Sequence, residues 1–209
     1  MKRDHDAGHP DAPGRMPHAP AALAPSHARL ASLVTSLGAR PRPVRVVQKR
    51  AHWHQRAAAK ALWAVTFGGQ RTYLSHYVTT LGHTIYVPDD FADWHPDHAW
   101  QVLRHELVHV RQFERYGWLG MILLYGFLPL PAGLAWGRAR LEWEAYRETL
   151  RAVVESEGLA AARAPALHRQ LVSRFTGPDY GWMWPFPRAV QGWIDAALDE
   201  IERDLAEPR

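Results

Sequence analysis

The string Arg104-His105-Glu106-Leu107-Val108-His109 carries the chemically most informative spacing in this sequence. It has the form H-E-x-x-H and lies in a segment whose apolar residues recur with a helical period. Two histidines four residues apart lie on one face of a helix, where both imidazoles can bind one metal ion. The carboxylate of Glu106 can then take a proton from a metal-bound water. We therefore predict His105 and His109 as metal ligands and Glu106 as a general base, against the alternative of a core histidine pair beside a surface glutamate.

A later helical segment offers a third ligand. Glu142 and Glu144 are two residues apart, so their side chains point about 200° apart around a helix and only one can face the metal. Glu144 shares an arc with several charged residues, which is typical of a solvated face. Glu142 falls within an apolar arc, where a carboxylate needs a strong partner. We predict Glu142 as the third ligand and Glu144 at the surface; an ion pair of Glu142 with Arg138 remains open as the alternative.

The composition narrows the choice of metal and partner. The chain has 209 residues, a net charge of +4 and no cysteine. The lack of cysteine excludes thiolate metal sites, cysteine nucleophiles and disulfide scaffolds. Two imidazoles and one carboxylate favour zinc, at one ion per chain. The weak positive charge and the lack of a reading motif argue against a nucleic-acid partner.

The elements that must position these residues place strands early in the chain and helices late. The predicted strands are Val44–Gln48, Thr72–Thr80 and His83–Val87, of which the last two form a hairpin. The predicted helices are 28–37, 55–63, 97–116, 132–157, 165–175 and 188–205, with glycines ending several of them. This order predicts an α+β fold with an N-terminal sheet and a mainly helical C-terminal part.

The N-terminal segment differs in composition from the rest of the chain. Residues 1–28 contain five prolines, four histidines and almost no large apolar side chain, which predicts a disordered tail. Residues 29–209 are then expected to form a single domain. No apolar run of signal-peptide length follows the first basic residues, so the sequence predicts a cytoplasmic protein.

Residues 118–137 form the longest stretch without charge, WLGMILLYGFLPLPAGLAWG. About 20 apolar residues suffice for a transmembrane helix, but Pro129 and Pro131 interrupt this stretch near its middle. A buried, kinked helix pair or a hydrophobic edge lying in the membrane plane fits better. Peripheral membrane contact through 118–136 therefore stays open as an alternative.

The pattern His105-Glu106-x-x-His109, followed by Glu142-x-x-Ala145, resembles the zincin metallopeptidases of the gluzincin type. Its Glu-x-x-Ala part is similar to that of membrane-embedded CAAX-processing and heat-shock peptidases and of small bacterial zincins. The resemblance covers roughly Thr72 to Leu150 and implies a small zincin-like domain. In those families a glutamate on a second helix completes a zinc site, and Asp or Asn usually follows the alanine. Here Tyr146 occupies that position.

The resemblance implies a zinc-dependent peptidase that hydrolyses a peptide or protein substrate, with the hairpin supplying an edge strand for an extended chain. A further donor usually stabilises the oxyanion. Tyr146, His168 and Tyr180 are the candidates for that role or for supporting a ligand, on residue type alone. The alternative function is a zincin-fold module that binds metal without cleaving, as a structural or regulatory protein at a membrane surface. An intact Glu106 argues against this alternative.

Overall fold

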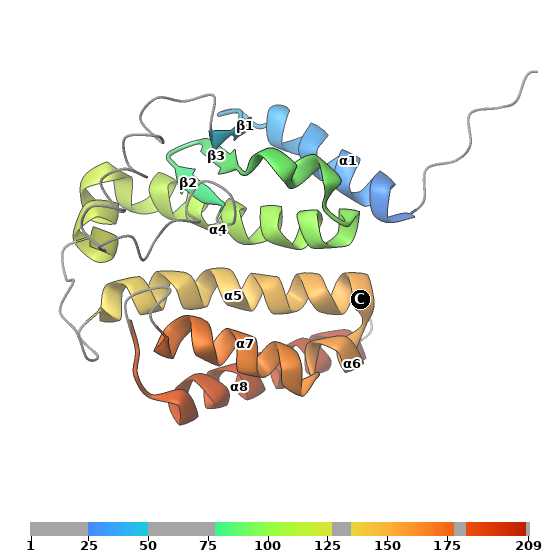
Figure 1. Cartoon of the computed structure of the whole chain (residues 1–209), viewed down its shortest axis with the longest axis vertical. Coiled ribbons are helices and arrows are strands. Elements are labelled where there is room, and N and C mark those ends of the chain that lie inside the picture. The colour runs from blue at the N-terminus through green and yellow to red at the C-terminus, as the bar shows by residue number, and fades with distance from the viewer. Residues whose placement is uncertain (1–24, 50–77, 127–134, 178–182, 208–209) are drawn as a thin grey trace, which may run out of the picture.

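The computed structural model describes residues 25–49, 78–126, 135–177 and 183–207 (Figure 1). Most of these residues are helical, and a three-stranded sheet lies near the N-terminus. The predicted α+β class is therefore confirmed. In chain order the elements are α1 (Pro25–Gly38), β1 (Arg45–Gln48), β2 (Thr79–Leu81), β3 (Thr84–Val87), the 3-10 segment η2 (Asp89–Asp93), α4 (Pro96–Met121), the π-helical segment η3 (Ile122–Gly126), α5 (Trp136–Glu157), α6 (Leu159–Ala162), α7 (Pro165–Thr176) and α8 (Pro187–Ala206).

The ends of these helices differ in part from the predicted ones. Helix α1 begins at Pro25, three residues before the predicted helix start at residue 28. A proline fits the first helical position because its fixed φ is helical and its missing N–H has no partner there. Residues 1–24, the predicted helix 55–63 and most of the predicted strand 72–80 lie outside the described residues. The short α6 and η2 were not predicted, since a single turn carries no periodicity.

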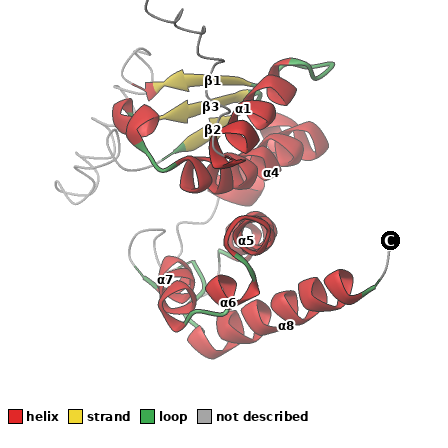
Figure 2. Ribbon diagram, turned by 90° about the vertical axis from the view of Figure 1, so that its right-hand side faces the viewer, coloured by secondary structure: helices red, strands yellow, loops and turns green. Residues whose placement is uncertain are grey.

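The sheet has the strand order β1-β3-β2 (Figure 2). Strand β3 pairs parallel with β1 and antiparallel with β2, so β2 and β3 form the predicted hairpin. Gly82 makes the turn with φ of +59°, a conformation that glycine adopts without steric cost. Every residue of β3 is buried because this strand lies between the other two. Among the described strands, β2 is therefore an edge.

Helix α4 uses two opposite faces, and this positions the H-E-x-x-H residues. Leu103, Leu107 and Val110 recur at helical spacing and pack with α1 and the sheet in one apolar cluster. His105 and His109 each lie two residues from a member of that row, which is about 200° around the helix. The apolar row thus holds α4 against the sheet and directs both histidines toward α5.

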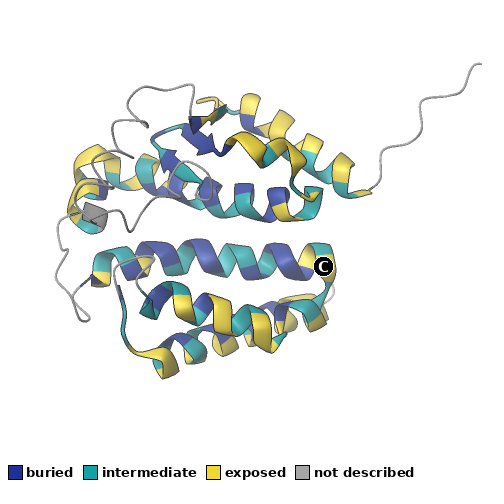
Figure 3. Cartoon of the chain, in the orientation of Figure 1, coloured by how far each residue is buried: buried dark blue, intermediate teal, exposed yellow. Residues whose placement is uncertain are grey.

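A second apolar cluster lies on the other side of the α4–α5 pair and joins α5 to α7 and α8. Figure 3 shows buried residues along α5 and on the inner faces of α7 and α8. In α8 the apolar residues recur three and four positions apart, which predicts one inner row, and Val190, Ile194, Ala197, Leu198 and Ile201 of that row are buried. Leu205 continues the same spacing but is 64% exposed, because the whole last turn of α8 is exposed.

The predicted helix stop at Gly117 is a kink in the structure. Gly117 has φ of +65°, and the helical path resumes beyond it through Met121 and η3. Residues 127–134, which contain both prolines of the uncharged stretch, lie outside the described residues. No helix in the described part of the chain is both long enough and apolar enough to cross a membrane.

Candidate metal centre

His105, His109 and Glu142 form the one group of metal-ligand side chains found among the described residues. Their ligand atoms all lie within 4.8 Å of one another. The two oxygens of Glu142 lie 3.7 Å from Nε2 of His105 and 3.8 Å from Nε2 of His109. The structure thus brings together the two motif histidines and the glutamate that helical periodicity selected. Glu106 is not part of this group.

These distances fit a tetrahedral ion with small adjustments. Zinc bonds of about 2.0–2.1 Å at tetrahedral angles put neighbouring ligand atoms about 3.3 Å apart. The nitrogen-to-oxygen separations of 3.7 and 3.8 Å exceed that value by about half an ångström or less. They are also longer than a hydrogen bond, so the three side chains face one position rather than only each other.

A hydrogen bond on the far side of the ring fixes the tautomer of His105. Nδ1 of His105 lies 3.0 Å from Oγ1 of Thr149, and the Thr149 hydroxyl donates its proton to the carbonyl of Ala145 at 3.2 Å. With that proton committed, Oγ1 accepts a hydrogen bond from Nδ1–H of His105. The lone pair on Nε2 then faces Glu142, which is the tautomer that metal binding needs.

The tautomer of His109 is fixed in the same way, by the side-chain amide of Gln112. The amide nitrogen of Gln112 lies 3.0 Å from the carbonyl of Leu141 and 3.1 Å from a carboxylate oxygen of Glu144. Both of these groups accept, so Nε2 of Gln112 donates to them and Oε1 faces Nδ1 of His109 at 2.9 Å. His109 therefore carries its proton on Nδ1 and offers Nε2 to the centre.

Glu144 has a supporting position rather than a ligand position. Its carboxylate accepts from Gln112 and pairs with Arg140 at 3.4 Å. The side chain is 29% exposed, whereas that of Glu142 is 1% exposed. Glu142 therefore faces the histidines, and Glu144 holds the amide that orients one of them.

Burial of Glu142 makes its charge costly, and the histidines compensate for it. Burial lowers the pKa of His105, but Glu142 together with the charge of Glu106 outweighs this effect and raises the pKa above its usual value. The buried carboxylate therefore favours the protonated imidazole. A metal ion at the same place would compete with that proton, so metal binding would be coupled to proton release.

Glu106 lies on the same helix but turns toward the sheet. The hydroxyl of Thr80 in β2 donates to Oε2 of Glu106 at 2.7 Å, and both side chains are buried. Lys49, just after β1, is fully buried. Burial lowers the pKa of Lys49 to about 8, against the opposite effect of the Glu106 charge. The carboxylate is therefore held by one hydroxyl donor and lies in the field of a buried ammonium.

The three further candidates differ in their placement. The ring of Tyr146 meets the His105 ring edge-on, with centroids 4.8 Å apart, and so packs against a histidine of the metal-ligand group. His168 lies on α7, where Nε2 bonds the carbonyl of Ala162 and Nδ1 accepts from Gln191. Both nitrogens of His168 are engaged there, so the structure does not bring this residue to the metal group. Tyr180 lies outside the described residues.

Polar contacts continue along the α4–α5 interface beyond the metal group. Gln101 donates to Ser156 and to Glu157, and Arg104 pairs with Glu148 and Glu155. Early residues of α4 meet late residues of α5, so the two helices run antiparallel. Neither apolar cluster of the described residues contains members from both helices. We call this interface the polar seam, and it runs from Gln101 and Glu157 to Gln112 and Glu144.

Sequence reasoning missed Gln112, Thr149, Thr80 and Lys49. Gln112 shares a helix face with the two histidines, and Thr149 lies two turns after Glu142 on its own helix. Gln112 follows His109 by three residues and Thr149 follows Glu142 by seven, and these spacings are the sequence signals that could have indicated both residues. Thr80 and Lys49 reach Glu106 from the sheet, and no spacing along the chain indicates that contact.

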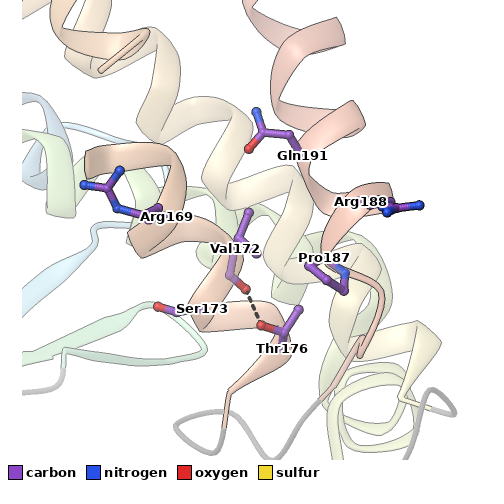
Figure 4. Close-up of a pocket in the computed structure, with 7 residues that line it drawn as sticks. All are labelled: Arg169, Val172, Ser173, Thr176, Pro187, Arg188 and Gln191. Carbon is purple, nitrogen blue, oxygen red and sulfur yellow. Dashed lines mark hydrogen bonds between the residues drawn. The ribbon is translucent and has the colours of Figure 1, made fainter. Parts of the chain in front are cut away.

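A separate shallow cavity lies between α7 and the start of α8 (Figure 4). Its volume is about 390 Å³, and its lining includes Arg169, Ser173 and Arg188. The guanidinium groups of Arg169 and Arg188 point to opposite sides in Figure 4, so they do not converge on one ligand. No residue of the metal group lines this cavity.

Comparison of the chain with family models, with curated proteins and with solved structures finds no match. The site must therefore be interpreted from its own geometry.

Proposed function

We propose that this protein is a zinc-dependent peptidase that uses His105, His109 and Glu142 as ligands and Glu106 as the general base. The observation that carries the proposal is the convergence of the two Nε2 atoms on a buried carboxylate, with both imidazoles held in the tautomer that leaves Nε2 unprotonated. With the proton of each ring on Nδ1, the Nε2 lone pairs of both histidines face the side where Glu142 lies. This arrangement matches the preorganised ligand shell of a metal centre.

Zinc, when bound, would supply a Lewis acid that acidifies water and polarises a carbonyl group. His105, His109 and Glu142 would leave a fourth position open to water and substrate. Glu106 would accept the proton of the attacking water on its carboxylate and return it to the leaving amine. Thr80 fixes one oxygen of that carboxylate at 2.7 Å, so the base has a defined orientation before substrate binds.

The hairpin supports an extended peptide as the substrate. Strand β2 is an edge of the described sheet, and its Thr80 contacts Glu106 directly. A peptide paired with the open side of β2 would run past the catalytic glutamate. The scissile bond and the base would then be brought together by main-chain hydrogen bonds, independent of the substrate's side chains.

The test combines metal analysis with a peptide cleavage assay. Purified full-length protein is expected to bind one zinc per chain and to cleave a mixed peptide library, detected by mass spectrometry. Glu142→Gln should lose the metal, and Glu106→Gln should keep the metal and lose cleavage. Glu155→Gln is the matched control, because it makes the same change on the same helix at a residue that pairs only with Arg104 among the contacts described here. A wild-type protein that binds no zinc would refute the proposal.

A metal-binding module that does not cleave is the second candidate. Glu106 accepts a hydrogen bond from Thr80 and lies in the field of Lys49, so it has a structural role that does not depend on catalysis. This weakens the argument that only catalysis explains the glutamate. Zinc-loaded wild type that cleaves nothing in the library, and is destabilised by Glu106→Gln, would favour the module.

A further inference from the structure

Exposed large apolar side chains gather at one end of the α4–α5 pair. We call this group the apolar end surface; its members are Trp118, Leu119, Ile122, Leu123 and Trp136. They are 58%, 71%, 55%, 51% and 60% exposed, respectively. Only three other large apolar residues in the described part of the chain are classed as exposed, namely Val34, Phe186 and Leu205. A concentration of this kind marks an interaction surface rather than ordinary surface composition.

Two separate segments are held together to make this surface. A Cβ added to Gly137 would lie 2.6 Å from the carbonyl oxygen of Leu124, so the start of α5 touches the backbone of η3. This contact brings Trp136 next to the segment that carries Ile122 and Leu123. Glycine at 137 is therefore what allows the two apolar segments to meet.

Trp118 is held in place by contacts with α4 and with the β2–β3 turn. Its ring packs on the Phe113 ring with centroids 5.0 Å apart, and it covers Gly82 in the β2–β3 turn. More than half of the side chain still faces outward. The surface therefore has one tryptophan on each segment, and tryptophan is the residue type that favours the boundary between water and lipid.

The charges at its border indicate the kind of partner. No charged residue occurs from Trp118 to Gly137, and arginines flank this stretch on both sides. Arg111 and Arg115 precede it and Arg138 and Arg140 follow it; Glu144 pairs with Arg140, and Glu114 pairs with a further arginine, Arg40. An apolar centre with tryptophans and a cationic border complements the interface of an anionic bilayer.

We propose that the apolar end surface docks this protein on the surface of a membrane containing anionic lipid, as a peripheral contact. The finding that no described helix can span a bilayer agrees with a contact of this kind. The proposal does not rest on the peptidase function, because the five residues lie outside the metal group. The proposal develops the alternative of peripheral membrane contact that the sequence of residues 118–136 suggests.

Vesicle co-sedimentation of the full-length protein tests the proposal. We expect binding to vesicles of phosphatidylcholine mixed with phosphatidylserine, weaker binding to phosphatidylcholine alone, and weakening by salt. The double variant Leu119→Ser/Ile122→Ser should lower the partition coefficient at least about tenfold, because each side chain contributes roughly that much on insertion. Val34→Ser/Leu205→Ser is the matched control, since it removes two exposed apolar residues elsewhere and should bind like wild type.

Three results would overturn the proposal. The first is wild-type protein that stays in the supernatant with both vesicle types. The second is an equal loss of binding in the control variant. The third is concentration-dependent self-association, abolished by Leu119→Ser/Ile122→Ser and without vesicle binding, which would assign the surface to contact between copies of the chain. Unchanged zinc content and circular dichroism show that each variant is folded, and Glu106→Gln should bind vesicles like wild type.

Discussion

Gln112 offers the sharpest test of how this site is organised, because its amide makes three hydrogen bonds that connect a ligand to the opposite helix. It accepts from His109 at 2.9 Å and donates to Leu141 and Glu144 at 3.0 and 3.1 Å. Gln112→Met keeps the length of the side chain and removes all three bonds. His109 then loses the acceptor that holds its proton on Nδ1, and the buried ring is free to rotate or to change tautomer.

The expected effect has two separable parts. Loss of an acceptor behind a metal-binding histidine lowers metal affinity by about 10–100-fold. The buried N–H of His109 and the carbonyl of Leu141 also lose a partner, which lowers the free energy of unfolding by about 1–3 kcal/mol. Zinc affinity is measured by competition with a fluorescent chelator. Stability is measured by urea denaturation of the metal-free protein.

Two companion variants separate orientation from packing. Gln101→Met makes the same change in the same polar seam, where Gln101 is 7% exposed and bonds Ser156 and Glu157. It should lower stability and leave zinc affinity unchanged. Gln112→Glu keeps an acceptor for His109 but places a second carboxylate against Glu144. It should hold zinc at least as tightly as wild type while losing as much stability as Gln112→Met.

The reasoning is refuted if Gln112→Met binds zinc within twofold of wild type. It is equally refuted if Gln101→Met loses as much affinity as Gln112→Met, because the effect would then come from the seam as a whole. Gln112→Glu should bind zinc as tightly as wild type and yet be as unstable as Gln112→Met. General damage to the fold would instead lower affinity and stability together.

Three further predictions concern pH, metal removal and packing. The pKa of His105 is raised in the metal-free fold, so the contribution of this group to stability is complete below the unfolded pKa and is lost as pH rises through the folded pKa. The free energies of unfolding of metal-free wild type and His105→Asn should therefore differ less as pH rises. A difference that grows with pH would contradict this. Zinc at about 100 times its dissociation constant should add about 2.7 kcal/mol to the free energy of unfolding, and a melting temperature indifferent to chelator would argue against a folded-state site. Gly137→Ala should destabilise the protein by about 1–3 kcal/mol, because the added Cβ would meet the Leu124 backbone at 2.6 Å. Gly192→Ala in α8 meets nothing within 4 Å and should stabilise the protein by up to about 1 kcal/mol. Thermal melts that rank the two variants the other way would reject this packing.

The convergence of the three predicted ligands was accessible from the sequence because it depends on helical geometry alone. Four-residue spacing put His105 and His109 on one face, and the apolar arc of the later helix distinguished Glu142 from Glu144. The same periodicity predicts the inner face of α8 correctly except at Leu205, which lies in the exposed last turn of the helix. Local periodicity predicts which way a side chain points along its own element.

The supports of the ligands were not accessible, because they depend on how two elements register with each other. Thr149 reaches His105, and Gln112 reaches Leu141, only once α4 and α5 lie antiparallel at a particular offset. The parallel pairing of β1 with β3 and the contact of Thr80 with Glu106 are likewise tertiary. The sequence placed Glu144 on a solvated face, and only the structure shows that it also accepts a hydrogen bond from Gln112.

The polar seam gives the molecule a plane along which it can part. Each apolar cluster stays on its own side of that plane, so separation of α4 from α5 would expose these hydrogen bonds and ion pairs together with the Tyr146 ring, which packs on His105. Such contacts contribute little net free energy each, because water replaces them. His105 and His109 lie on one side of the plane and Glu142 on the other, so a bound ion would cross-link α4 to α5. Hydrogen exchange of the amides along the seam, compared with and without zinc, would then report the occupancy of the site.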